Sequence, residues 1–154
     1  MHDSPAPPAP PAHPTPGLAA FTPYLLSKVG RTARARVGDR LAARGLRMWH
    51  MAVLSSLAAD GPQPQRDLAT RLAVHPSDMA KVLDELTRAG WVDRERDSDD
   101  RRRITATLTA AGRTALAELE AEVAAVQDAL LAPLDADERN TLHRLLLRLH
   151  TATG

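Results

Sequence analysis

The sequence contains no cysteine and only four aromatic residues among its 154 positions. Without cysteine there can be no disulfide, no thiolate metal site and no cysteine-based redox sensor. With so few aromatic side chains, a hydrophobic core has to be built from Leu, Val and Ala, which favours helices over sheets. The sequence therefore predicts a mainly α-helical fold with little strand.

Long apolar runs are absent as well. No segment approaches the ~20 consecutive apolar residues that a membrane-spanning helix needs, and the N-terminus lacks the basic-then-apolar order of a secretory signal. We therefore expect a cytoplasmic protein that binds no membrane. The length suits one compact domain with appendages, because two independent cores would need more chain.

Charge is unevenly distributed, although the formal net charge is only +1. Residues 18–44 carry six basic side chains against the single acidic Asp39, whereas residues 109–154 carry four basic against seven acidic. Residues 62–108 are balanced, with nine of each sign. Any binding of nucleic acid must therefore rely on local clusters of basic residues and not on bulk charge.

Proline and glycine mark the boundaries of the first segments. Most prolines lie in residues 1–17, a composition that predicts a disordered Pro/Ala-rich tail. A long helix is expected from Thr22, its N-cap, to just before Gly45, with apolar residues at every fourth position: Leu25, Val29, Ala33, Val37 and Leu41. A second helix is expected over residues 46–59, with one buried side formed by Trp49, Val53 and Leu57.

Two shorter helices joined by a tight turn follow. Gln63 and Pro64 open the first, and Pro76 opens the second, which ends at Gly90. The first is expected to bury Leu68, Ala69 and Leu72, and the second Met79, Val82, Leu83 and Leu86. This arrangement is typical of a helix-turn-helix.

A charged hairpin is expected next. Residues 91–96 and the alternating residues 104–108 predict two strands, joined by an acidic turn at residues 97–100 and three consecutive arginines. A hairpin with a charged tip directly after a helix-turn-helix is a wing. The predicted fold class is therefore mainly α with a small β wing, a winged helix-turn-helix.

The C-terminal third predicts dimerisation helices. Apolar residues recur three and four apart at Leu116, Leu119, Val123, Val126 and Leu130. Pro133 interrupts this seam, Asp135 and Glu138 supply a capping box, and a last helix continues the spacing with Leu142, Leu145, Leu146 and Leu149. The apolar surface of these two seams and of the first helix is larger than one small winged domain can cover. This favours a homodimer over an intramolecular bundle.

The residues Asp100 to Gly112, DRRRITATLTAAG, resemble the wing signature of the MarR (multiple antibiotic resistance regulator) family, in which Asp and Arg residues precede a Leu-Thr pair and a Gly three positions later. The stretches 67–69 and 83–92 resemble the helix-turn-helix of the same family. The resemblance implies one MarR-like domain over residues 18–154. Within it, residues 18–45 and 109–150 would be dimerisation helices and residues 46–108 the winged helix-turn-helix. The chain differs from the family pattern at Pro64 and at His75-Pro76.

The resemblance also implies a function, that of a bacterial transcription regulator. We expect sequence-specific binding to double-stranded DNA, as a repressor that binds a palindromic operator as a homodimer. A helix in the major groove reads base edges with its first turns, which here contain His75, Pro76, Ser77, Asp78 and Lys81. For Ser77 and Asp78 the alternative role is capping of that helix.

The three arginines of the wing are the second set of candidate DNA contacts. Arginine suits a narrow minor groove, and its position in the resembled motif makes Arg102 the candidate for insertion. Arg101 and Arg103 are expected either to pair with Asp99 and Asp100 or to contact phosphates. Arg94 and Arg96 are expected to add contacts to the DNA backbone. The alternative is a salt-bridged hairpin that faces solvent.

Other function classes find less support. There is no phosphate-cradling glycine loop, nucleophile motif or pair of catalytic carboxylates, so we expect no enzyme. The six histidines show no helical pair at metal-ligand spacing, so we expect neither a metal site nor a cofactor. A dimer whose winged domain binds a protein partner remains the alternative, and steep salt dependence would distinguish DNA binding from it.

A small-molecule effector is implied by the resemblance, namely an aromatic acid or another phenolic compound between the dimerisation helices and the winged domain. The candidate contacts are Trp49 and His50, which would offer an apolar wall with one polar group. The alternative is that Trp49 belongs to the core and that His50 is a surface residue.

Overall fold

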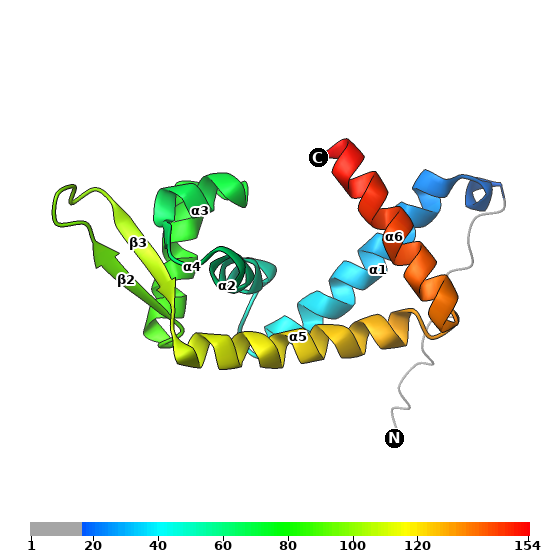
Figure 1. Cartoon of the computed structure of the whole chain (residues 1–154). Coiled ribbons are helices and arrows are strands. Elements are labelled where there is room, and N and C mark those ends of the chain that lie inside the picture. The colour runs from blue at the N-terminus through cyan, green and yellow to red at the C-terminus, as the bar shows by residue number, and fades with distance from the viewer. Residues whose placement is uncertain (1–16) are drawn as a thin grey trace, which may run out of the picture.

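The computed structural model describes residues 17–154, so the predicted tail lies, apart from Gly17, outside the described residues. Helices α3 (Gln65–Arg71) and α4 (Pro76–Arg88) and the strands β2 (Val92–Arg96) and β3 (Ile104–Leu108) form one end of the molecule (Figure 1). Helices α1 (Thr22–Ala42) and α6 (Ala136–Thr153) form the other end. Helix α5 (Ala110–Leu130) runs between the two ends, and α2 (Met48–Asp60) lies between them above α5. A short 3₁₀ helix, Leu18–Ala20, precedes α1.

The sheet has three strands and not the predicted two. A two-residue strand β1 (Gln63–Pro64) pairs antiparallel with β3, so that the order is β1-β3-β2. The wing register runs from Val92 opposite Leu108 to Arg96 opposite Ile104. The sequence could not reveal β1, because two residues are too few to show alternation. Its position at the edge of the sheet is compatible with Pro64.

One hydrophobic core joins the winged part to the ends of two neighbouring helices. The four predicted residues of α4 are all buried in it: Met79, Val82, Leu83 and Leu86. Leu41 at the end of α1 is buried in the same core, as is Leu119 of α5. The first half of the predicted dimer seam, Leu116 and Leu119, was therefore wrongly assigned to a partner chain. The stripe is continuous along α5, but its N-terminal half covers the chain's own core.

Helix α2 buries a different side from the predicted one. Val53 and Leu57 are buried, but Trp49 is 42% exposed and His50 is only 1% exposed. The alternative that placed Trp49 in the core and His50 on the surface is therefore wrong, whereas their role as effector contacts stays a prediction. The buried face of α2 follows the spacing 50, 53, 54 and 57, and a buried imidazole is tolerated because both of its nitrogens have partners.

The helix termini largely follow the predicted signals. Asp135 and Glu138 form the expected capping box at the start of α6, with both reciprocal hydrogen bonds at 2.9 Å. At the start of α1, however, Thr22 is the first helical residue and Phe21 occupies the N-cap. Gly45 has a positive φ of 70°, a conformation that glycine adopts without strain, and it follows the end of α1 as expected.

Helices α1 and α6 leave much apolar surface uncovered within one chain. The α6 helix contains no buried residue, and Leu145, Leu146, Leu147 and Leu149 are all exposed. On α1 the exposed large apolar residues are Leu25, Leu26 and Val29. Across residues 17–154 no helix has both the length and the apolar character needed to cross a membrane.

Candidate nucleic-acid interface

The first turn of α4 presents the five predicted base-reading residues to solvent. His75 is the N-cap of the helix, and its Nδ1 accepts the backbone N–H of Ser77 at 3.2 Å. The hydroxyl of Ser77 lies 2.7 Å from the same nitrogen. Since Nδ1 is an acceptor, the proton of the neutral ring lies on Nε2, which leaves an N–H donor at the mouth of the helix. Pro76, Asp78 and Lys81 are also exposed.

The tip of the wing is organised by its own aspartates. The carboxylate of Asp97 accepts the backbone N–H groups of Asp99 at 2.8 Å and Asp100 at 3.4 Å. These hydrogen bonds hold the pKa of Asp97 below its ordinary value. Asp100 in turn accepts the backbone N–H of Arg102 at 3.0 Å. The turn is thus shaped by side-chain to backbone hydrogen bonds.

The three arginines of the wing project from this turn, and all three are exposed. Among residues 17–154, none of them forms an ion pair with Asp99 or Asp100. The predicted pairing of Arg101 and Arg103 with those aspartates is therefore wrong. The two carboxylates and the guanidinium groups lie in one short loop. The carboxylate of Asp100, however, accepts the backbone N–H of Arg102 and not a guanidinium N–H.

The side chains of the two arginines of β2 form polar contacts within the winged part. Arg94 Nη2 lies 2.6 Å from the carboxylate Oδ1 of Asp84 on α4. Arg96 Nη1 donates to the carbonyl oxygen of Arg101 at 3.4 Å. The contact of Arg94 joins the hairpin to α4, and the contact of Arg96 joins strand β2 to the tip of the same hairpin. Asp84 was not among the predicted site residues, since an acidic residue in a DNA-binding helix gives no signal of a supporting role.

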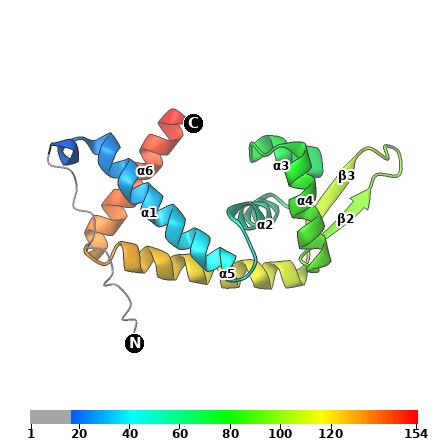
Figure 2. The same ribbon diagram turned by 180° about the vertical axis from the view of Figure 1, so that it is seen from behind.

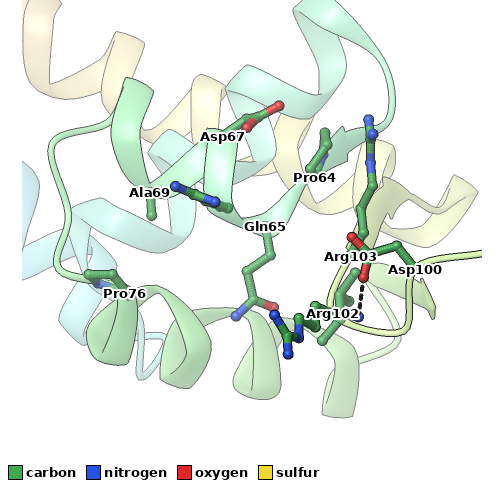
Figure 3. A pocket seen from close by; sticks show the side chains of 10 residues that line it. Pro64, Gln65, Asp67, Ala69, Pro76, Asp100, Arg102 and Arg103 are labelled. Carbon is green, nitrogen blue, oxygen red and sulfur yellow. Dashed lines mark hydrogen bonds between the residues drawn. The ribbon is translucent and has the colours of Figure 1, made fainter. Parts of the chain in front are cut away.

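A hollow of about 560 Å³ separates the wing from the start of α3. Gln65 extends from the first turn of α3 toward Arg102, whereas Arg103 extends in the opposite direction (Figure 3). The side-chain oxygen of Gln65 is buried and has no hydrogen-bond partner in the described part of the chain. The lining residues come from α3, the start of α4 and the wing: Pro64, Gln65, Arg66, Asp67, Ala69, Pro76, Asp100, Arg102, Arg103 and Ile104.

The hollow has a basic lining, with three arginines against two aspartates. Arg66, Arg102 and Arg103 form no ion pair within residues 17–154. Unpaired guanidinium groups around a concavity are suited to a phosphate group. Sequence reasoning missed Gln65 and Arg66, because both lie outside the first turns of α4 and outside the wing, where the DNA contacts were expected.

The two residues expected to contact an effector lie in different environments. Trp49 and its neighbour Met48 are exposed, whereas the imidazole of His50 is enclosed and hydrogen-bonded on both sides. An effector could reach Trp49 without rearrangement. It could reach the ring nitrogens of His50 only by displacing their partners in the chain.

Comparison with known proteins identifies the family. The model of the MarR family matches residues 46–104, the segment from α2 to the start of β3. The HTH-type transcriptional repressor Rv2887 of Mycobacterium tuberculosis is 35% identical over 135 residues, which cover 86% of this chain and 97% of that protein. This chain belongs to the MarR family. That family consists of transcription regulators and not of enzymes.

Solved structures of MarR-family proteins share the fold. The crystal structure of the M. tuberculosis protein Rv2887 in complex with DNA is 32% identical, with a TM-score of 0.73, and covers 84% of this chain and 97% of its own. The PcaV regulator of Streptomyces coelicolor, solved in complex with its natural ligand, is 27% identical, with a TM-score of 0.68 and coverage of 92% and 100%. The predicted fold class and the family resemblance are both confirmed.

Proposed function

We propose that this protein is a transcriptional repressor that binds an inverted-repeat operator in double-stranded DNA as a homodimer. One observation carries the proposal: the first residue of α4 and two arginines of the wing line a single basic hollow, so that helix and wing face the same side. A recognition helix and a wing on one face can engage a major groove and the flanking minor groove together. The relative Rv2887 was solved in complex with DNA, which supports binding of DNA by this chain.

In this arrangement α4 enters the major groove by its N-terminal end. The Nε2–H of His75 donates to a base or phosphate acceptor, and Ser77, Asp78 and Lys81 lie within reach of base edges. Arg102 enters the minor groove, while Arg66 and Arg103 contact phosphates at the hollow between the two grooves. Arg94 and Arg96 act indirectly, because their contacts to Asp84 and to the Arg101 carbonyl hold the hairpin in place.

The homodimer supplies the second half-site contact. The exposed leucines of α6 and the exposed apolar residues of α1 need a facing surface, and a second copy of the chain offers the same surface in return. A two-fold dimer places two α4 helices on one face of the duplex. The operator is then an inverted repeat with half-site centres about one helical turn, ~10 base pairs, apart.

An aromatic acid is the proposed effector, with Trp49 as its stacking surface. The exposure of Trp49 supports this assignment. The relative PcaV, which was solved in complex with its natural ligand, supports the existence of an effector. Titration of salicylate into the protein should quench tryptophan fluorescence in the wild type and much less in Trp49→Phe. Equal quenching in both proteins would place the ligand elsewhere.

Binding of DNA is tested by selection from a randomised duplex pool with the wild-type protein. The selected and a scrambled duplex are then compared by fluorescence anisotropy over a range of KCl concentrations. We expect the selected duplex to bind at least about 10³-fold more tightly, and the affinity for both to fall steeply as salt rises. Failure to enrich any duplex would overturn the proposal and favour the alternative, a dimer whose winged domain binds a protein.

A further inference from the structure

His50 connects helix α2 to helix α4. Its Nδ1 accepts the backbone N–H of Arg47 at 2.9 Å, at the start of α2. Its Nε2 contacts the carboxylate Oε2 of Glu85, on α4. A backbone amide always carries its hydrogen, so Nδ1 bears none, and the proton of the ring lies on Nε2. His50 is therefore a neutral imidazole that donates to the carboxylate of Glu85.

Glu85 also contacts the guanidinium group of Arg47, at the start of α2. Arg47 Nη2 lies 3.5 Å from Oε2, the oxygen that His50 contacts. The hydrogen bond from His50 and the positive charge of Arg47 both favour the ionised carboxylate and hold the pKa of Glu85 below its ordinary value. The two partners differ in rigidity, since His50 is buried whereas the side chain of Arg47 is 62% exposed. The imidazole is the partner whose position is determined by packing.

The location of this contact gives it a mechanical role. Helix α2 contacts α5, as does α1, and these helices form the connection to the dimerisation end (Figure 2). The neighbouring residue of α4, Asp84, accepts a hydrogen bond from Arg94 of the wing. Consecutive carboxylates of the recognition helix are thus attached to the wing and to the α2 start. Apolar packing beneath α4 is non-directional, whereas these hydrogen bonds depend on angle and distance.

We propose that His50 is a positioning residue for DNA recognition: through Glu85 it fixes the placement of α4 relative to the dimerisation helices, and so sets the half-site spacing that the dimer accepts. The inference rests on the proposed function. In a two-fold dimer the distance between the two recognition helices is set by how each α4 is held to its own dimerisation helices. Without the His50–Glu85 contact, α4 is held by apolar packing, by the wing contact and by the exposed side chain of Arg47, and the dimer tolerates other spacings.

The test uses the selected inverted repeat and versions with one base pair inserted or removed between the half-sites. Asn at position 50 can replace Nδ1 as acceptor for Arg47 but is too short to reach Glu85. Gln at position 50 can extend an amide N–H to the place of Nε2. We expect His50→Asn to lower the ratio of native-spacing to altered-spacing affinity about tenfold. His50→Gln should retain most of the wild-type ratio.

Two controls separate positioning from stability and charge. Val53→Ala removes buried apolar volume from α2 and should lower the melting temperature without changing the spacing ratio. Glu120→Gln removes an exposed carboxylate from α5 and should change neither. Glu85→Ala, at a partly exposed position, removes the acceptor of the His50 hydrogen bond and should repeat the loss of spacing preference even where His50→Asn folds poorly.

Each result leads to a definite conclusion. A lowered ratio in His50→Asn and Glu85→Ala, with a wild-type ratio in Val53→Ala, supports the positioning role. A wild-type ratio in folded His50→Asn, or in Glu85→Ala, overturns that role and leaves the proposed function intact. A wild-type protein that selects no duplex at all overturns the proposed function itself.

Discussion

Gly112 packs directly against the backbone of Trp91. A Cβ at position 112 would overlap the carbonyl oxygen of Trp91 and lie 2.7 Å from Cδ1 of Leu108. The same carbonyl accepts the N–H of Thr109 at 3.1 Å, and the Thr109 hydroxyl accepts the N–H of Gly112 at 3.0 Å. The Leu-Thr pair and the glycine of the wing signature therefore form one tight joint between the end of β3 and the start of α5.

Substitution Gly112→Ala should destabilise the protein by about 1–3 kcal/mol, because the joint has no room for a methyl group. Urea denaturation followed by circular dichroism measures the change. Gly38→Ala is the control, since a Cβ at position 38 meets nothing within 4 Å and alanine is the better helix former. Equal stability of Gly112→Ala and the wild type would show that α5 can shift at this point without cost.

Substitution Leu145→Asp should convert the dimer to a monomer and abolish binding of DNA. Leu145 is exposed within one chain, and in the proposed dimer it is covered by the partner, where an unpaired carboxylate costs on the order of 3–5 kcal/mol. Sedimentation velocity at low micromolar concentration measures the change. Arg144→Asp, which places the same carboxylate at the adjacent polar position of α6, should remain dimeric. A dimeric Leu145→Asp would exclude this face of α6 from the interface.

Substitution Arg102→Ala should weaken specific binding of DNA by about 1–3 kcal/mol. The winged segment is electrically balanced overall, so bulk attraction does not mask the loss of one well-placed guanidinium. Anisotropy titrations should show the largest loss for operators with a narrow A-T tract beneath the wing, where the minor-groove potential is most negative. Arg148→Ala on α6 should bind as the wild type does.

The pattern of loss decides the role of Arg102. A loss of equal size on every sequence would identify a phosphate contact instead of minor-groove insertion. Wild-type affinity in Arg102→Ala, with an unchanged dimer, would remove the wing from recognition and leave α4 to account for binding.

Acidification should loosen the tip of the wing through Asp97. The pKa of this carboxyl is lowered in the folded protein, so its contribution is fully present above the ordinary value of 3.8 and is lost as pH falls through the lowered pKa. The amide proton shifts of Asp99 and Asp100 in NMR spectra report this titration, because both amides donate to Asp97. In Asp97→Asn the step should disappear, whereas Asp93→Asn should retain it. A step that persists in Asp97→Asn would assign it to Asp99 or Asp100 themselves.

Elements with a strong local signal could be predicted residue by residue. The inward side of α4 follows from helical periodicity, and the capping box of α6 follows from Asp135 and Glu138 three residues apart. The wing strands follow from alternation around an acidic turn. In each case neighbours along the chain supply the stabilising interactions, so the pattern is visible in the sequence itself.

The candidate site was predicted only in part, because its supporting residues come from distant segments. The proposed DNA contacts of α4 lie close together in sequence, as do those of the wing, so both sets could be named. Gln65 and Arg66 became site residues only because β1 and α3 lie beside the wing. The role of Glu85 depends on His50, thirty-five positions away, and neither residue has a periodic signal that indicates the other.

The sequence by itself determined the local elements: where helices begin and end, which side of α4 is apolar, and that a basic hairpin follows a helix-turn-helix. Only the tertiary structure decided that Leu119 belongs to the chain's own core and that α6 has no cover within one chain. It also decided that His50 is buried and Trp49 exposed. Burial depends on which element packs against a stripe, and two apolar stripes of the same period look alike until the chain has folded.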